Sequence, residues 1–245
     1  MKKGILLCCH GSRSSVGTKD TLKLLKLFKK KYRSYTVKIG YLEINKITIK
    51  KQLDFFFKKK FDKLIIVPVM IFSGNHSSKD IPKVINSVRN KYSKIPELLL
   101  TKPLVNSKIF VSKIEKKLKA KIKTFKKQDI ALILVASNTI NLQAKREMNY
   151  LLKKLAKRNN IIFYKKILVG LNGNESKNKL LKIKKNKKYI FLLPLFLFRG
   201  SLFFILESIV KKLNNELKIN KFKMLPIIKS YNHIFLSISK QLDNT

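Results

Sequence analysis

The sequence predicts an α/β protein made of two tandem similar domains, each a small parallel sheet flanked by helices in a flavodoxin-like topology. Short apolar runs alternate along the chain with longer amphipathic stretches, in which lysines separate the apolar residues. Strands and helices that alternate in this way favour a parallel sheet with helices on both faces.

The first half of the chain supplies the elements of one such domain. Strands are expected at residues 5–9, 37–42, 64–72 and 97–100. Helices are expected at residues 18–32, 47–60, 81–91 and 107–121, where apolar side chains recur at helical spacing. Pro82 opens the third helix, and Asp80 stands where its side chain would cap that helix.

The second half repeats this pattern at a constant distance. His10 aligns with Ala136 and Gly74 aligns with Gly200, and the members of each pair are 126 residues apart. The joint between the halves is a polar, lysine-rich run, as expected for a short linker. The repeat therefore predicts two domains, residues 1–125 and residues 126–245.

The charge of the chain is strongly basic. Its 245 residues include 56 Lys and Arg against 13 Asp and Glu, for a formal net charge of +43. Nucleic acids and anionic membranes are common partners of such chains. Here the basic residues are mostly Lys and lie along the whole sequence, among many Asn, Ile and Phe, as an A+T-rich genome would encode. We therefore expect no specific nucleic-acid partner, and a basic cleft would suit a small polyanionic substrate.

The cysteines and the apolar runs favour a cytoplasmic protein. Cys8 and Cys9 are adjacent, a geometry that strains a disulfide, and we expect both to be buried thiols. The first residues are too short a run for a signal peptide. The most apolar stretch, 189–206, is interrupted by Pro194 and Arg199, so no membrane span is expected. Assembly into a homo-oligomer is left open.

Two histidines are expected at one edge of the first sheet. His10 follows the first strand, and His76 lies in the loop after the third strand. Glu43 ends the second strand. Parallel strands bring their carboxyl ends to the same edge, where open sheets bind ligands. Because neutral imidazole suits first-row divalent metals and also transfers protons, this spacing predicts a metal site or an acid–base site.

The residues after His10 add functions to this edge. Gly11 lets the backbone turn sharply. Ser12 is placed to bond the loop or a substrate carboxylate, and Arg13 to pair with a carboxylate in bidentate fashion.

The second half lacks these groups. Ala136 stands at the position of His10, and Leu202 stands at the position of His76. The third histidine, His233, lies outside any such loop, and we expect it to be structural or exposed. The candidate chemistry therefore belongs to the first half alone.

These motifs resemble those of the class II chelatases, specifically the CbiX-type sirohydrochlorin cobaltochelatases of the long, two-repeat form. The resemblance rests on the HGSR tetrad at 10–13, the Leu-Glu pair at 42–43, the Gly-Asn-His and Asp-Ile-Pro segments at 74–82, and the Leu-Pro-Leu-Phe-Leu-Phe-Arg-Gly segment at 193–200. Two positions depart from the family pattern: Ala-Ser-Asn-Thr at 136–139 replaces a glycine-rich loop, and a proline is missing near Ile47.

The resemblance implies a function and roles for these residues. His10 and His76 would hold the incoming metal, and His10 would accept protons from the pyrrole nitrogens. Contacts to the macrocycle would come from Ser12, Arg13, Glu43, Ile71, Phe72, Ser73, Gly74 and Asn75. The implied reaction is insertion of Co²⁺ into sirohydrochlorin for cobalamin biosynthesis. It would need neither ATP nor a tightly bound cofactor, which agrees with the lack of a nucleotide motif in the sequence.

Three alternatives stay open at this point. In the first alternative the metal is Fe²⁺, in a sirohydrochlorin ferrochelatase for sirohaem, or Ni²⁺, since affinity order alone does not select the metal. In the second, the protein is a non-catalytic carrier of tetrapyrrole or metal that has kept the fold. In the third, it is a basic nucleic-acid binder, which would need clustered charge and exposed aromatic rings.

Overall fold

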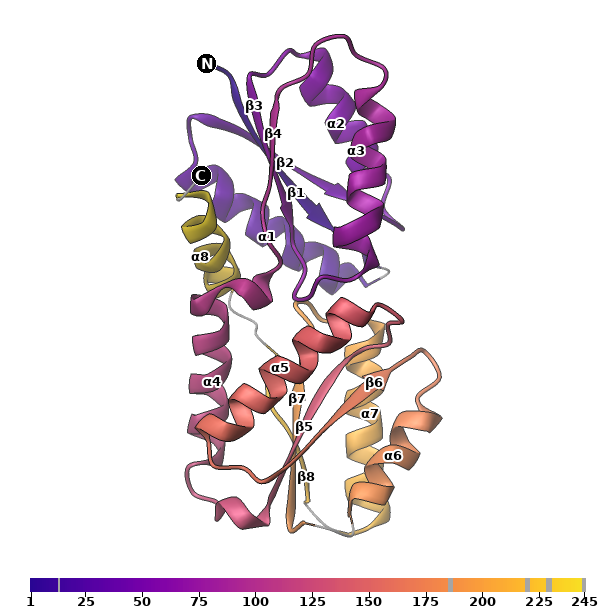
Figure 1. Cartoon of the computed structure of the whole chain (residues 1–245). Helices are drawn as coiled ribbons and strands as arrows, with labels where there is room; N and C mark the ends of the chain where they lie inside the picture. Colours follow the sequence, from indigo (N-terminus) through magenta and orange to yellow (C-terminus); the bar gives the residue numbers. More distant parts are fainter. Residues whose placement is uncertain (13, 185–186, 219–220, 228–230, 244–245) are drawn as a thin grey trace. The chain divides into compact units, whose positions relative to one another are not determined.

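The computed structural model describes residues 1–12, 14–184, 187–218, 221–227 and 231–243. By their contacts these residues form two compact units (Figure 1). Unit 1 comprises Met1–Phe110 and Ser230–Thr245, and unit 2 comprises Val111–Lys229. The contacts thus group residues 111–125 with the second half of the chain and the last helix with the first half, whereas the sequence repeat places its joint between residues 125 and 126.

Unit 1 is built on a parallel sheet, as the sequence predicts. Its strands are β1 (Lys3–Cys9), β2 (Tyr35–Tyr41), β3 (Lys63–Pro68) and β4 (Glu97–Leu100), in the order β2-β1-β3-β4. In β1, Leu7 pairs with Ile39 of β2 and with Val67 of β3. Because β1 is buried along its length and lies between two strands, the residue that follows it emerges at the centre of the sheet edge.

The third strand is shorter than its apolar run predicts. β3 ends at Pro68, whereas a strand was expected over 64–72. Val69 still donates its N–H to the Cys8 carbonyl, at 2.8 Å, but β3 extends no further. Ile71 and Phe72 remain buried without belonging to the strand. An apolar run records burial, and it does not distinguish a strand from a buried loop.

Helices cover the sheet of unit 1. They are α1 (Ser15–Lys31), α2 (Ile49–Lys58), α3 (Ile81–Arg89) and α8 (Tyr231–Leu242), with the short π-helix η1 (His76–Asp80) before α3 and the 3₁₀ turn η2 (Leu104–Asn106). On one face, Leu53 and Phe56 of α2 and Ile85 of α3 pack with Leu6 and Cys8 of β1. On α1, fully buried Phe28 meets Phe235 of α8 edge to face, with ring centroids 5.1 Å apart.

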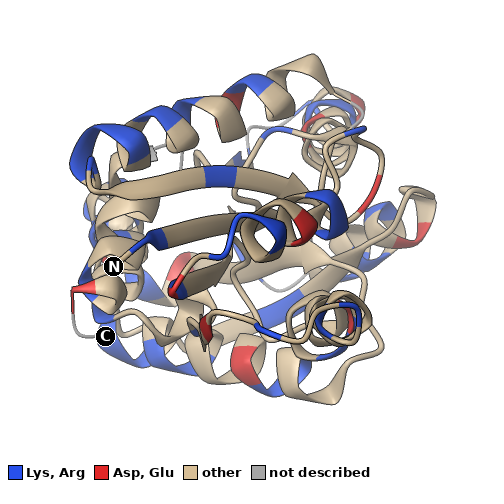
Figure 2. Cartoon of the chain, turned by 90° about the horizontal axis from the view of Figure 1, so that it is seen from above, with Lys and Arg blue, Asp and Glu red and all other residues tan. Residues whose placement is uncertain are grey.

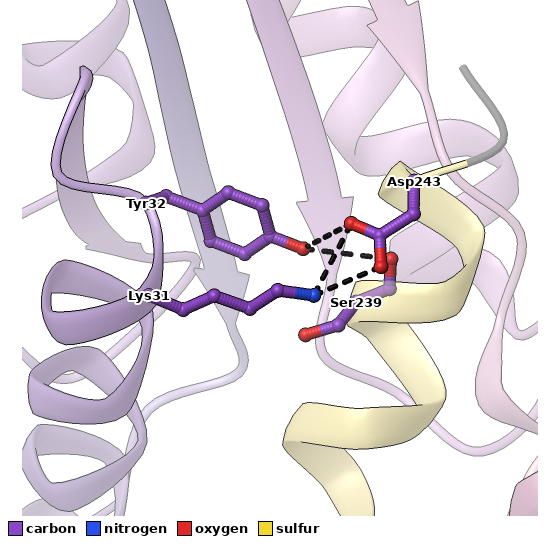
Figure 3. A network of polar contacts seen from close by, with 4 residues as sticks. All are labelled: Lys31, Tyr32, Ser239 and Asp243. Carbon is purple, nitrogen blue, oxygen red and sulfur yellow. Dashed lines mark hydrogen bonds and ion pairs between the residues drawn. The ribbon is translucent and has the colours of Figure 1, made fainter.

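A polar network holds the end of α8 against the end of α1 (Figure 3). Lys31 Nζ donates to both carboxylate oxygens of Asp243, at 2.8 and 3.2 Å. The Tyr32 hydroxyl donates to Asp243 Oδ1 at 3.1 Å and to the Ser239 carbonyl at 3.4 Å. The hydrogen bond from Lys31 holds the pKa of Asp243 below its usual value. These contacts and the aromatic pair fasten the last helix to unit 1.

Unit 2 repeats the topology of unit 1. Its parallel strands are β5 (Ile130–Ser137), β6 (Phe163–Val169), β7 (Tyr189–Pro194) and β8 (Phe222–Met224), in the order β6-β5-β7-β8. Its helices are α4 (Lys108–Ile122), which begins at the unit boundary, η3 (Lys127–Asp129), α5 (Leu142–Arg158), α6 (Asn174–Lys184) and α7 (Ser201–Glu216). The two sheets have equivalent strand orders, so the α/β fold predicted for each half is confirmed.

The surface matches the dispersed basic residues of the sequence. Lys and Arg are spread over many helices, strands and loops, with few Asp and Glu among them (Figure 2). Among the residues that the structure describes, none of the helices is both long and apolar enough to cross a bilayer.

Candidate active site

Three side chains converge at the carboxyl edge of the sheet in unit 1. His10 directly follows β1, Glu43 follows β2 after Leu42, and His76 begins η1 after β3. Since β1 lies between β2 and β3, these three strands deliver their following residues to one place. One nitrogen or oxygen from each of the three side chains lies within 4.8 Å of the others. Within the described ranges, this is the one such cluster of three His, Cys, Asp or Glu side chains.

Backbone hydrogen bonds fix His10 beside Glu43. Glu43 donates its N–H to the His10 carbonyl at 3.1 Å, and Leu42 donates to the Cys9 carbonyl at 3.0 Å. Gly11 has φ +105°, and a Cβ at this position would clash with the Glu43 carbonyl oxygen. Only glycine satisfies both conditions, so Gly11 permits the close approach of the two loops.

His10 and Glu43 form a loose, solvated pair. His10 Nδ1 lies 3.9 Å from Glu43 Oε2, and each side chain is about half exposed (53% and 55%). A pair so exposed gains little from its mutual attraction. Both groups are therefore free to exchange a proton or a metal ion with an incoming ligand.

His76 is held much more tightly. Its Nδ1 lies 2.7 Å from Asp80 Oδ2, one helical turn further along the chain. A neutral imidazole that donates from Nδ1 to this carboxylate keeps its lone pair on Nε2. The ring also lies against that of His10, with centroids 4.5 Å apart and planes tilted by 41°. The carboxylate thus sets the ring orientation and the nitrogen that is available for a ligand.

Two expectations about this segment are wrong. His76 does not lie in a loop, because it is the first residue of η1. Asp80 does not cap α3, because its backbone is already helical (φ −72°, ψ −45°) and its side chain makes no capping bond. The π-helical turn runs directly into α3 and satisfies the first N–H of that helix, since Ile81 donates to the His76 carbonyl. The Asp80 carboxylate is consequently left for His76.

The other predicted residues have varied positions. The Ser12 hydroxyl accepts a hydrogen bond from the Ser14 N–H at 3.0 Å, so it serves the loop locally. Ile71 and Phe72 are 7% and 9% exposed and belong to the core, while Ser73, Gly74 and Asn75 are half-buried. Arg13 lies outside the described residues. Contacts from any of these residues to a substrate stay a prediction.

Sequence reasoning missed the roles of two residues. Asp80 was assigned to a helix cap, although its spacing of four from His76 would have placed both on one face of a continuous helix. Asn45 was not singled out, and its Oδ1 accepts the Ser12 N–H at 3.3 Å. No sequence motif indicates this role of Asn45, because the contact with Ser12 depends on how the two loops fold.

The donor set suits a divalent first-row metal that binds and leaves. Two imidazoles and a carboxylate are borderline to hard ligands of the kind that Co²⁺, Fe²⁺ and Zn²⁺ accept. Ligands at about 2.0–2.1 Å from one tetrahedral ion lie roughly 3.4 Å apart. The separations of up to 4.8 Å exceed this, so all three groups would have to close in to share one ion. Such an open three-ligand site favours transfer of the metal over permanent storage.

The second unit offers no equivalent site among its described residues. Ala136 and Ser137 end β5, and Leu202 lies in the first turn of α7. His233 lies on α8, in unit 1, outside the metal-type cluster. Among the described residues, the cluster of His10, Glu43 and His76 therefore lies in unit 1 alone.

Two known proteins are similar to this chain in sequence. A sirohydrochlorin ferrochelatase of Priestia megaterium is 23% identical over 217 residues, which cover 86% of this chain and 79% of that protein. A sirohydrochlorin cobaltochelatase of Saccharolobus solfataricus is 35% identical over 86 residues, or 34% of this chain and 62% of that protein.

The fold is also shared with a solved structure. The sirohydrochlorin chelatase SirB from Bacillus subtilis subspecies spizizenii, in complex with cobalt, has a TM-score of 0.79 over all of this chain and 95% of that one, at 18% identity. The family model CbiX matches residues 4–121, which contain His10, Glu43, His76 and Asp80. Residues 4–121 of this chain therefore belong to the CbiX family of class II chelatases.

Proposed function

We propose that this protein is a metal chelatase that inserts a divalent metal ion into a sirohydrochlorin-type tetrapyrrole, with Co²⁺ as the preferred metal. The observation that carries the proposal is the cluster of His10, Glu43 and His76 at one sheet edge, inside the residues that match the family. Unit 1 therefore supplies the chemistry, and the substrate is a tetrapyrrole whose carboxylates suit a basic protein.

Insertion exchanges protons for metal. Two pyrrole N–H groups lose their protons, and the four ring nitrogens then bind the ion. The two positive charges of the metal replace those of the two released protons, so the charge is balanced. His10 is the proton acceptor, because its ring is half exposed and only loosely paired with Glu43. The cluster is compact, so the metal ligands and the proton acceptor would meet the macrocycle together.

His76 is the fixed ligand for the incoming ion. With Nδ1 directed to Asp80, the ring presents Nε2 in a constant tautomer, which is the usual arrangement around metal-binding histidines. His10 and Glu43 lack such a constraint and can move away as the macrocycle takes the ion. One fixed and two loose ligands suit a site that must release its metal.

The metal itself is a choice between Co²⁺ and Fe²⁺. Relatives named for cobalt and for iron both match this chain, and the iron-named one covers more of it. The two-repeat length favours Co²⁺ and cobalamin biosynthesis, and sirohaem biosynthesis is the alternative. No ATP and no tightly bound cofactor take part in this scheme. We place the reaction in the cytoplasm, where the buried thiols of Cys8 and Cys9 stay reduced.

The test is anaerobic metallation of sirohydrochlorin followed by absorbance, with Co²⁺, Fe²⁺ and Ni²⁺ in turn. The protein should accelerate insertion above the protein-free rate, and the metal with the highest kcat/KM identifies the pathway. Equal rates with and without protein for every metal would leave a carrier or a nucleic-acid binder as the better assignment. RNA binding with a steep salt dependence would favour the binder.

A further inference from the structure

A cavity lies in unit 2, away from the cluster of His10, Glu43 and His76. It has a volume of about 550 Å³, within the usual range of small-molecule sites. Residues from α4, β7, α7, β8 and the segments after them line it: Lys121, Phe125, Phe191, Arg199, Phe203, Glu207, Lys223, Met224, Leu225, Pro226 and Ile227.

The walls of this cavity are aromatic and apolar. Phe191 and Phe203 are almost fully buried, and the Phe125 ring meets that of Phe191 edge to face at 5.1 Å. Leu225 and Ile227 are also buried. Such walls fit the flat apolar body of a ligand.

Three of the four charged side chains in its lining are cationic. Arg199 Cζ lies 5.9 Å from the centre of the Phe203 ring, and Lys223 Nζ lies 5.7 Å from that of Phe125. Among the described residues, no ion pair joins Lys121, Arg199 or Lys223 to Glu207, the one acid of the lining, or to any other acid. The cavity therefore carries an excess of positive charge next to aromatic rings.

Arg199 gives the most specific indication of a ligand. Its Nε is buried and finds no hydrogen-bond acceptor within the described part of the protein. A buried N–H without an acceptor is destabilising, and such groups commonly mark a missing partner. Arginine is also scarce here, with six in a chain whose basic residues are otherwise lysine. A guanidinium is the group that binds carboxylates in planar, bidentate geometry.

We propose that this cavity binds a small aromatic carboxylate, whose ring lies among Phe125, Phe191 and Phe203 and whose carboxylate accepts hydrogen bonds from Arg199. The proposal is independent of the metal chemistry assigned to unit 1. Lys223 adds charge at the same cavity without a fixed geometry. The volume of about 550 Å³ leaves room for a single aromatic ring system.

The four methionines of the chain permit a direct test. Protein labelled with ¹³C at the methionine methyl groups reports on Met224 in the cavity, on Met148 on the buried face of α5, and on Met1 and Met70 in unit 1. The probe is 1-naphthoate, with neutral 1-naphthamide as its matched control. The Met224→Leu variant assigns the resonance.

Naphthoate should shift the Met224 methyl in a saturable way and leave Met148 and Met70 unchanged, while naphthamide binds about tenfold more weakly or less. Arg199→Gln should weaken naphthoate about tenfold, as expected for loss of a charge-assisted hydrogen bond, and Lys223→Gln should weaken it by a smaller factor. Arg146→Gln, an exposed change of the same charge on α5, should leave binding unaltered.

Three results would overturn the proposal. Met224 does not respond to millimolar naphthoate, or it responds equally to naphthamide, or Arg199→Gln and Arg146→Gln bind naphthoate equally well. The Met148 resonance shows in each variant whether unit 2 is folded. Lys223→Gln gives a second route to the same conclusion if Arg199→Gln does not fold.

Discussion

Nδ1 of His76 lies 2.7 Å from Oδ2 of Asp80, whereas Nδ1 of His10 lies 3.9 Å from Oε2 of Glu43. The two imidazoles of the site therefore differ in constraint, although their rings are in contact. The Asp80 carboxylate is within hydrogen-bond distance of the His76 ring, and the Glu43 carboxylate is beyond that distance from the His10 ring. In the proposed function, this difference would separate His76, a metal ligand with a constant tautomer, from His10, the proton acceptor.

Removing the carboxylate of Asp80 should impair metal binding at His76. Asp80→Ala should lower metal affinity and turnover about 10- to 100-fold, the usual cost of losing the partner of a metal-binding histidine. Asp80→Asn should recover part of the loss, because its amide oxygen still accepts from Nδ1. The visible spectrum of bound Co²⁺ should change in Asp80→Ala. If Asp80 had a purely structural role, this spectrum would stay as in the wild type.

Asp129→Asn is the matched control for Asp80, since it removes an acid in unit 2, far along the chain from the cluster. It should leave the Co²⁺ spectrum and the rate of metallation as in the wild type. If Asp80→Ala and Asp129→Asn behave alike, the carboxylate of Asp80 has no part in positioning His76.

Gly11→Ala should destabilise unit 1 and disturb the site at once. A side chain there must adopt φ +105° and clash with the Glu43 carbonyl, so we expect a loss of more than about 1 kcal/mol in the free energy of unfolding. Gly170→Ala, where a Cβ meets no atom within 4 Å, is the control and should be nearly neutral. Denaturant titration of both variants measures the difference, and equal stabilities would contradict the close loop packing.

The contact between Lys31 and Asp243 should depend on pH. Hydrogen bonding to Lys31 lowers the pKa of Asp243 in the folded state, so this carboxylate stabilises the fold above its unfolded pKa of about 3.9. That contribution is lost as pH falls through the lower, folded pKa. The pair is partly exposed and screened by solvent, so its contribution is about 0.2–1 kcal/mol.

Thermal melts of the wild type and Asp243→Asn at several pH values provide the measurement. The variant should melt at a lower temperature at pH 6, and the difference between the two curves should shrink as the pH falls below about 4. A constant difference across this range would show that Asp243 acts through packing and not through its charge.

The thiols of Cys8 and Cys9 should be unreactive in the native protein. Both side chains are buried, and burial raises the pKa of Cys9 to about 12 and that of Cys8 well above its usual value. A chromogenic aromatic disulfide at pH 8 should therefore react with neither thiol until guanidinium unfolds the chain. Fast reaction of the native protein would contradict the burial of β1.

Much of the fold and of the site follows from the sequence for one physical reason. Apolar runs mark the strands, and parallel strands necessarily bring their carboxyl ends together, so His10, Glu43 and His76 were predicted to meet. The helix periodicity shows which face of α8 is apolar but not which sheet it covers, so its place in unit 1 was not predicted. Asp80 was misassigned because a loop was expected where a π-helical turn continues into α3. The cavity around Arg199 depends on how several helices and strands pack together, and a local sequence pattern does not predict that packing.

The proposal that His10 and His76 carry out metal insertion is tested most directly by the rate of anaerobic Co²⁺ insertion into sirohydrochlorin by the His10→Ala/His76→Ala variant. His233→Ala, which removes the one imidazole outside the cluster, is the control. We expect the wild type and His233→Ala to accelerate insertion, while the double variant remains folded and falls to the protein-free rate. A double variant that inserts the metal as fast as the wild type would contradict the assignment of the reaction to this site.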